Sequence, residues 1–91
     1  MQYVVCYDIS DDRRRDRMAR TLLDFGTRVQ ESVFVANLED EQAERMRKRI
    51  GKVLSKEADR VHVFVVCAAC ERRTEVLGDG EVPSDPPFIV I

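Results

Sequence analysis

The chain has 91 residues, which is enough for one compact domain but not for two, and a domain of this size buries only a modest core. Its 15 basic and 17 acidic side chains give a formal charge of -2, so overall charge alone does not mark it as a nucleic-acid binder. An odd number of cysteines without an export signal argues against a disulfide framework, and no window approaches a membrane span, so we expect a cytoplasmic protein.

The first predicted element is a short strand over residues 3–7, YVVCY, because this run is apolar, β-branched and aromatic. Asp8 stands where the strand emerges, at the rim of the predicted sheet. One carboxylate is a poor site for Mg²⁺, but a two-fold dimer would supply a second copy and make Asp8 a candidate metal ligand. The alternative is that Asp8 starts a turn or caps the next helix.

A helix follows, with a cap at Ser10 or Asp11, an end at Phe25 and Gly26 as the residue that stops it. Its apolar stripe consists of Met18, Ala19, Leu22, Leu23 and Phe25. Its basic residues are Arg13, Arg14, Arg15, Arg17 and Arg20. Arginines repeated every three or four residues can form charge-assisted bonds to successive phosphates. A solvated face paired with the aspartates of the same helix is the alternative.

Residues 27–38, TRVQESVFVANL, change to a period of two and predict extended structure with a break near Glu31 and Ser32. The alternation places Arg28, Gln30 and Ser32 on one face, together with Phe34, which is unexpected on an outer face. No Gly or Pro marks a turn, so one long strand and two short strands both remain open. The polar row is either a contact to phosphate or substrate, or an ordinary solvent-facing surface.

A second helix is predicted over residues 39–54, and a second apolar strand over residues 61–67, VHVFVVC. The stripe of this helix is Ala43, Met46, Ile50, Val53 and Leu54. Its acidic residues come first and its basic cluster later, in agreement with the helix dipole. The basic cluster is Arg45, Arg47, Lys48, Arg49 and Lys52. The predicted order is β, α, β (possibly divided in two), α, β.

Cys67 and Cys70 have the spacing of half a zinc site or of a redox pair. Only Cys6 and His62 remain as further soft ligands, so we favour structural or incidental cysteines. Residues 71–76 form a possible short strand, and residues 77–87 read as a turn-rich connector. The final FIVI, residues 88–91, is expected to add as a strand to a sheet edge, either its own or a partner's.

Three segments together closely resemble the CRISPR-associated Cas2 family, the small subunit of the spacer-acquisition machinery. They are YDISDDRRRDRMARTLLDFG, TRVQESVFVANL and VHVFVVCAAC. The resemblance implies an α+β, ferredoxin-like βαββαβ domain with an antiparallel sheet over residues 1–78. It also implies a homodimer in which residues 79–91 dock their terminal strand on the partner. The dimer contacts so implied are Phe34, Phe88, Ile89, Val90 and Ile91.

By the same resemblance, Asp8 of two subunits would be the catalytic residue and would share Mg²⁺ or Mn²⁺. The residues expected near nucleic acid, with Arg17 added from the arginine row, are Ser10, Arg13, Arg14, Arg17, Arg28, Gln30 and Ser32. Glu31 departs from the family pattern, because an aromatic residue is common at that position, and a carboxylate there would weaken nucleic-acid contact.

Members of the family are described in two ways: as metal-dependent endonucleases on single-stranded RNA or duplex DNA, and as non-catalytic adaptors. An adaptor would bridge dimers of the CRISPR integrase subunit (the Cas1 family) around a DNA spacer precursor. A toxin-like ribonuclease is a third possibility. We therefore expect a homodimeric nucleic-acid-binding protein of CRISPR adaptation with metal-dependent phosphodiesterase capacity.

Overall fold

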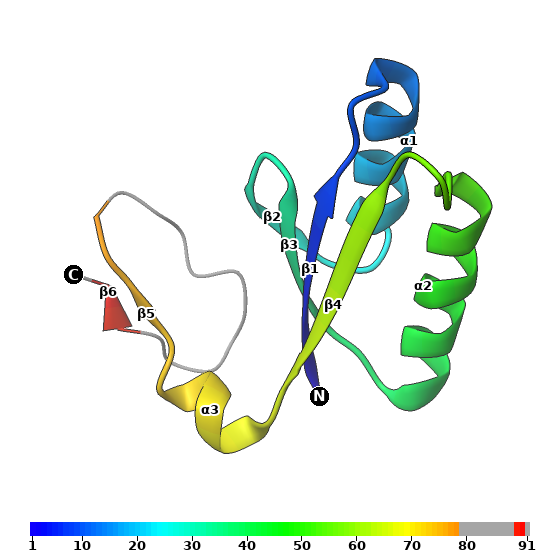
Figure 1. Ribbon diagram of the computed structural model, residues 1–91. Helices are drawn as coiled ribbons and strands as arrows, with labels where there is room; N and C mark the ends of the chain where they lie inside the picture. The colour runs from blue at the N-terminus through cyan, green and yellow to red at the C-terminus, as the bar shows by residue number, and fades with distance from the viewer. Residues whose placement is uncertain (79–88, 91) are drawn as a thin grey trace.

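The computed structural model describes residues 1–78 and 89–90 of the chain (Figure 1). Its elements are β1 (Gln2–Asp8), α1 (Asp12–Leu23), β2 (Thr27–Gln30), β3 (Val33–Asn37), α2 (Asp40–Val53), β4 (Arg60–Val66), α3 (Ala68–Arg72), β5 (Glu75–Val76) and β6 (Ile89–Val90). The first six elements confirm the predicted ferredoxin-like βαββαβ order. The question of one or two strands between the long helices is answered by two, β2 and β3.

The main sheet has four strands in the order β2-β3-β1-β4, and every neighbouring pair is antiparallel. β1 is therefore a central strand, with β3 on one side and β4 on the other. Both long helices, α1 and α2, cover the same face of this sheet (Figure 1). The domain has two layers, a helical layer and a sheet whose second face is left open by these helices.

The core lies between the two layers and follows the alternation of the strands. Tyr3, Val5 and Tyr7 of β1 are buried beneath the helices. Met18 and Met46, from α1 and α2, are fully buried against them. The apolar stripes predicted for both helices supply this core, except that Leu23 is 54% exposed. Burial of these stripes is what fixes the helices on the sheet.

Phe34 lies in the core, so its predicted place on the outer face of the strand is wrong. Its side chain is 1% exposed and packs with Tyr7, at 6.2 Å between ring centroids. The register of the β2–β3 hairpin shifts between Arg28 and Gln30, which puts Gln30 opposite Val33 but Arg28 opposite Phe34. Because residues paired across two strands share a face, Arg28 lies on the face of Phe34 and Gln30 lies on the face of Val33. Arg28 and Gln30 therefore do not share the one face that was predicted for both.

α1 begins at its predicted cap and ends earlier than predicted. The Asp11 carboxylate accepts a hydrogen bond from the backbone N–H of Arg14 at 2.9 Å. The helix ends at Leu23 rather than Phe25, and Gly26 does not have the positive φ of a left-handed helix stop. Gly26 is needed for another reason. A Cβ there would lie 2.8 Å from the Cβ of Ala36 and would collide with the carbonyl oxygen of Val35.

Gly26→Ala is therefore expected to lower the free energy of unfolding by about 1–3 kcal/mol, because β3 backbone has to move to admit the methyl group. Gly51→Ala in α2 is the matched control, since a Cβ at Gly51 meets nothing within 4 Å. That control should stabilise the helix by roughly 0.5–1 kcal/mol. Urea titrations of both variants would measure the difference, and equal midpoints would contradict the close approach.

The segment after β4 contains a helix that the sequence did not predict. α3 begins after Cys67 and spans Ala68–Arg72, where a strand over residues 71–76 was expected. Only Glu75–Val76 of that range is a strand, β5, and it pairs in parallel with β6. Most of the predicted connector, with Phe88 and Ile91, lies outside the described residues. Within residues 1–78 and 89–90, no helix has the length and apolar character of a membrane span.

Candidate nucleic-acid and metal site

Asp8 is the last residue of β1, whereas the predicted strand ended one residue earlier, and its side chain is exposed. Alternation along β1 buries Val5 and Tyr7 under the helices, so Asp8 belongs with Val4 and Cys6 on the other face of the sheet. In the register of the sheet, Asp8 is opposite Arg60 of β4. A carboxylate therefore stands at the end of the central strand, on the face that α1 and α2 do not cover.

Asp8 lines an open hollow of about 570 Å³ between the end of β1, the start of α1 and the β2–β3 turn. The residues lining it are Tyr7, Asp8, Ile9, Arg15, Asp16, Arg28, Glu31 and Ser32. Three predicted site residues, Asp8, Arg28 and Ser32, thus meet around one space. Ser10, Arg13, Arg14, Arg17 and Gln30 do not line it. The sequence analysis named Arg15 only as a member of the basic cluster that could bind phosphates, and it gave Asp16 no role in the site.

The backbone carbonyl of Glu31 fixes Arg28 beside this hollow. It accepts hydrogen bonds from Arg28 Nε at 3.0 Å and Nη2 at 2.7 Å, and from the hydroxyl of Tyr7 at 3.1 Å. The guanidinium also lies over the ring of Phe34, 5.5 Å from its centroid. Because a guanidinium has five N–H donors, Arg28 is held in place and still has donors for a phosphate oxygen.

Arg15 holds the turn between β1 and α1. Its Nη1 donates to the carbonyl oxygen of Ile9 at 3.1 Å, and its Nη2 pairs with the carboxylate of Asp12. Ile9 is itself buried, so this turn is anchored from both sides. Arg15 and Arg28, the two arginines that line the hollow, are consequently positioned by backbone carbonyls rather than left free in solvent.

Arg14, predicted to bind nucleic acid, is engaged inside the protein. Its Nε and Nη2 donate to Asp59 at 2.7 and 3.1 Å, and the Asp59 side chain has no exposed surface. Hydrogen bonding to Arg14 holds the pKa of Asp59 below its usual value, and the same bond raises the pKa of Arg14. Arg14 therefore joins α1 to the segment before β4, and its contact with nucleic acid stays a prediction.

Arg13 and Arg17 of α1 have exposed side chains, as do Ser10 in the turn before α1 and Gln30 of β2. Among the residues that the structure describes, Arg13 and Arg17 make no ion pair. The predicted alternative, an arginine face neutralised by the aspartates of α1, therefore applies to Arg15 with Asp12 and only marginally to Arg14 with Asp11, at 4.0 Å.

The donor set in one chain does not make a complete metal site. Over residues 1–78 and 89–90, no group of three or more His, Cys, Asp or Glu side chains is placed to hold an ion. Asp8 offers one exposed carboxylate, which fits an ion only if a second protein copy, water or phosphate oxygens complete the coordination.

Cys67 and Cys70 are both free and exposed, on either side of the start of α3. The backbone N–H of Cys70 hydrogen-bonds to the Cys67 sulfur and lowers the pKa of that thiol. The pKa of Cys70 is raised instead, mainly by its hydrogen bond with Cys67. No further ligand joins the pair in the described part of the chain, so a zinc site is not formed there.

The open face of the sheet is apolar over its centre, although α1 and α2 lie on the other side. Val4, Val35 and Val66 are only partly buried there, and Phe64 is 54% exposed. The ring of Phe64 stacks on His62 of the same strand, at 6.1 Å between centroids. We call this surface, together with Cys6 and Val33, the open sheet face; Asp8 lies at its edge.

The family model described as CRISPR associated protein Cas2 matches residues 1–74. A CRISPR-associated endoribonuclease, Cas2 1, of Chloroflexus aurantiacus is 37% identical over 92 residues, which cover 100% of this chain and 99% of that protein. A CRISPR-associated endonuclease, Cas2 2, of Thermus thermophilus is 38% identical over 81 residues, which cover 89% of this chain and 86% of that protein. The crystal structure of a hypothetical protein from Thermus thermophilus superposes with a TM-score of 0.81 at 37% identity, covering 91% of this chain and 96% of that one.

Proposed function

This chain belongs to the Cas2 family of CRISPR-associated proteins, and from that premise we propose that it is a homodimeric, metal-dependent endonuclease that binds nucleic acid in CRISPR adaptation. The observation that carries the proposal is the position of Asp8 at the edge of the open sheet face, beside two arginines fixed by backbone carbonyls. Relatives named endoribonuclease and endonuclease support the activity.

The open sheet face supports the dimer. A half-exposed Phe64 among valines is the kind of apolar surface that a second protein surface covers, since burying apolar area is the main favourable term in association. If two copies meet through this face around a two-fold axis, each residue on it is presented twice. The two Asp8 side chains then lie at edges of the same interface, and the pair supplies the second carboxylate that one chain lacks.

In the proposed reaction the two Asp8 carboxylates would hold Mg²⁺ or Mn²⁺. The bound ion would polarise the phosphoryl oxygen and lower the pKa of its water. Arg28 would use its remaining N–H donors to bind the phosphate and to stabilise the charge that develops on it. Arg13 and Arg17, exposed on α1, would bind neighbouring phosphates.

Metal removal tests this proposal directly. Purified protein is incubated with single-stranded RNA or duplex DNA, with Mg²⁺, Mn²⁺ or EDTA, and both cleavage and gel shift are read. Cleavage is expected only with metal, whereas binding should persist in EDTA because the arginines need no ion. Binding without cleavage of either substrate would instead favour the second candidate, a non-catalytic adaptor between integrase dimers, for which the exposed Arg13 and Arg17 suffice.

Phe64→Glu is expected to convert the dimer to a monomer, because it would place two desolvated carboxylates in an apolar interface. Cleavage should be lost with the dimer while Asp8 remains intact. Leu23→Glu is the matched control, since Leu23 has the same 54% exposure as Phe64 but lies on α1 in the helical layer. Light scattering after gel filtration would measure both masses. A dimeric, active Phe64→Glu variant would exclude the open sheet face as the interface.

A further inference from the structure

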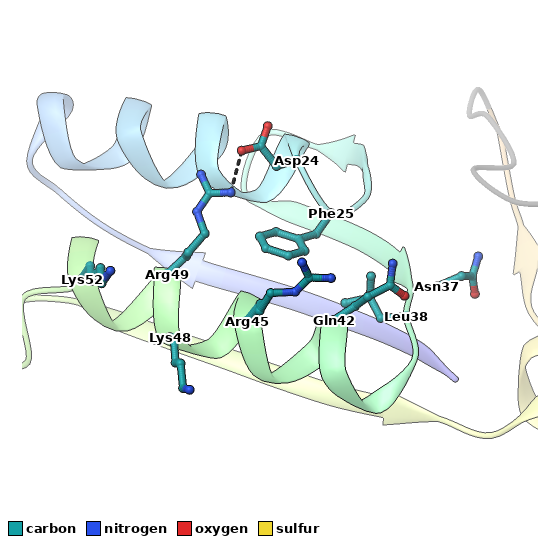
Figure 2. A pocket seen from close by; sticks show the side chains of 9 residues that line it. All are labelled: Asp24, Phe25, Asn37, Leu38, Gln42, Arg45, Lys48, Arg49 and Lys52. Carbon is teal, nitrogen blue, oxygen red and sulfur yellow. Dashed lines mark ion pairs between the residues drawn. The ribbon is translucent and has the colours of Figure 1, made fainter.

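A second positively charged surface lies on the helical layer, and Arg17 is its only residue to which the proposed function gives a role. A hollow of about 570 Å³ lies between α2 and the residues that follow α1 (Figure 2), and an adjoining hollow of about 370 Å³ lies between α1 and α2. The two hollows share Asp24 and Arg49. We call them together the interhelical groove. Its six basic residues are Arg17, Arg20, Arg45, Lys48, Arg49 and Lys52, against one acidic residue, Asp24. A net-acidic chain thus concentrates cations in one place.

Arg49 is fixed in the middle of this groove. Its Nη1 pairs with the carboxylate of Asp24 at 2.6 Å, and its guanidinium lies 5.4 Å from the ring centroid of Phe25. Figure 2 shows Arg49 reaching from α2 toward Asp24. Asp24 therefore neutralises one cation and positions it, while five basic residues of the groove remain.

Those five residues have no acidic partner inside the groove. Across residues 1–78 and 89–90, no ion pair involves Arg17, Arg20, Arg45, Lys48 or Lys52. Glu41 and Glu44 stand one turn before Arg45 and Lys48, but they do not line the groove. A cluster of unpaired cations repels itself, and the repulsion is relieved when an anion with several charges binds.

The spacing of the cations fits a chain of phosphates better than a single anion. Arg45 and Lys52 are seven positions apart on α2, which is roughly 10 Å along a helix. A nucleic-acid strand rises about 3.4 Å per nucleotide, so this row spans about three phosphates. Arg17 and Arg20 of α1 line the smaller hollow together with Arg49. We propose that the interhelical groove binds the sugar–phosphate backbone of a nucleic-acid strand, separately from the Asp8 site.

α1 and α2 lie on one face of the sheet (Figure 1), whereas the alternation along β1 places Asp8 at the edge of the other face. The groove and the Asp8 hollow have no lining residue in common. In a dimer formed through the open sheet face, both grooves would point outward. The inference thus deepens the proposed nucleic-acid binding by adding an accessory surface to each subunit, and it rests on that part of the proposed function.

The test uses Arg45→Gln/Lys52→Gln, which removes two exposed cations and leaves the Arg49 pair intact. Lys56→Gln/Arg72→Gln is the control, since it removes the same charge from exposed residues outside the groove. Full-length proteins are titrated into a labelled short duplex DNA or single-stranded RNA in EDTA, at several salt concentrations. Thermal melts check that both variants are folded.

The groove variant is expected to bind duplex DNA about tenfold more weakly, with a salt slope smaller by about 2, and single-stranded RNA with a slope smaller by about 1.4. The control should keep the wild-type slope. Equal losses in both variants, or no loss in either, would overturn the proposal. So would an unchanged nucleic-acid affinity combined with weaker binding of a labelled poly-glutamate peptide, which would assign the groove to an acidic protein segment.

Cleavage separates this inference from the catalytic half of the proposed function. Under saturating substrate and Mg²⁺, the groove variant should cleave at the wild-type rate, because Asp8 and Arg28 are untouched. If wild-type protein does not cleave but the groove variant still loses affinity, catalysis fails and the accessory surface stands. If wild-type protein cleaves and the groove variant binds normally, the catalytic proposal stands and the accessory surface fails.

Discussion

Asp8→Asn is expected to slow metal-dependent cleavage by at least about 100-fold while nucleic-acid affinity in EDTA changes little. The amide keeps the size of the side chain but removes the negative charge that a hard cation requires. Without a correctly held ion, the transition state loses several kcal/mol of stabilisation. Each 1.4 kcal/mol changes the rate roughly tenfold, which gives the expected loss in cleavage rate. Asp40→Asn is the control, because Asp40 is an exposed carboxylate at the start of α2 that does not line the Asp8 hollow.

Mixed dimers distinguish a shared site from two independent ones. Wild-type and Asp8→Asn chains with different tags are co-expressed, and the heterodimer is isolated through both tags. If both carboxylates of a two-fold pair hold one ion, the heterodimer should be as inactive as the mutant homodimer. If each subunit works alone, it should retain about half of the wild-type rate. Half-activity would therefore contradict the shared metal and leave each Asp8 with a separate role.

Asp59→Asn should lower Tm by about 10 °C, the largest stability effect we expect from an isosteric change. The Asp59 carboxylate, which has no exposed surface, accepts hydrogen bonds from Arg14 Nε and Nη2 and from the backbone N–H of Ser55 at 2.9 Å. An amide in its place turns one acceptor into a donor that faces other donors. Asp24→Asn, which weakens an exposed ion pair, is the control and should change Tm little.

The ion pair between Arg14 and Asp59 predicts that the stability of the fold depends on pH. Arg14 lowers the pKa of Asp59 from its ordinary value of 3.8, so the folded state holds this carboxylate ionised more strongly than the unfolded state does. Its contribution is fully present above pH 3.8 and is lost as pH falls through the lower folded-state pKa. The Tm difference between wild type and Asp59→Asn should therefore be constant near neutrality and shrink in acid. A difference that grows in acid would contradict the pair.

The elements that were predicted well from the sequence are those in which the apolar residues repeat with one clear period. β1, α1, α2 and β4 match their predicted ranges to within a few residues, because each carries a clear apolar pattern and α1 has a capping Asp11. α3 was missed because a five-residue helix is too short to show a period. β3 was placed on the wrong face because Val33 and Val35 are as apolar as Phe34, and a strand apolar on both faces does not reveal which side the helices cover.

The candidate site was predictable only where it depends on strand ends and local order. Asp8 could be identified as a candidate site residue because it comes at the end of a buried strand. The bond of Arg14 to Asp59 joins residues 45 positions apart, and no local pattern distinguishes Arg14 from Arg13 before the fold is known. The same holds for the interhelical groove, because its two rows of cations come from separate helices that only tertiary packing brings together.

The central place of β1 also has a consequence for how the chain folds during synthesis. Among the strands of the main sheet, β1 is made first and stays unpaired until β3 and β4 are made, and β4 is the last of them. At about 5–20 residues per second, the apolar β1 keeps an unpaired edge for several seconds. Contacts of such long sequence separation are slow to form. Chaperone binding to the nascent chain would thus be most useful before residue 66 emerges.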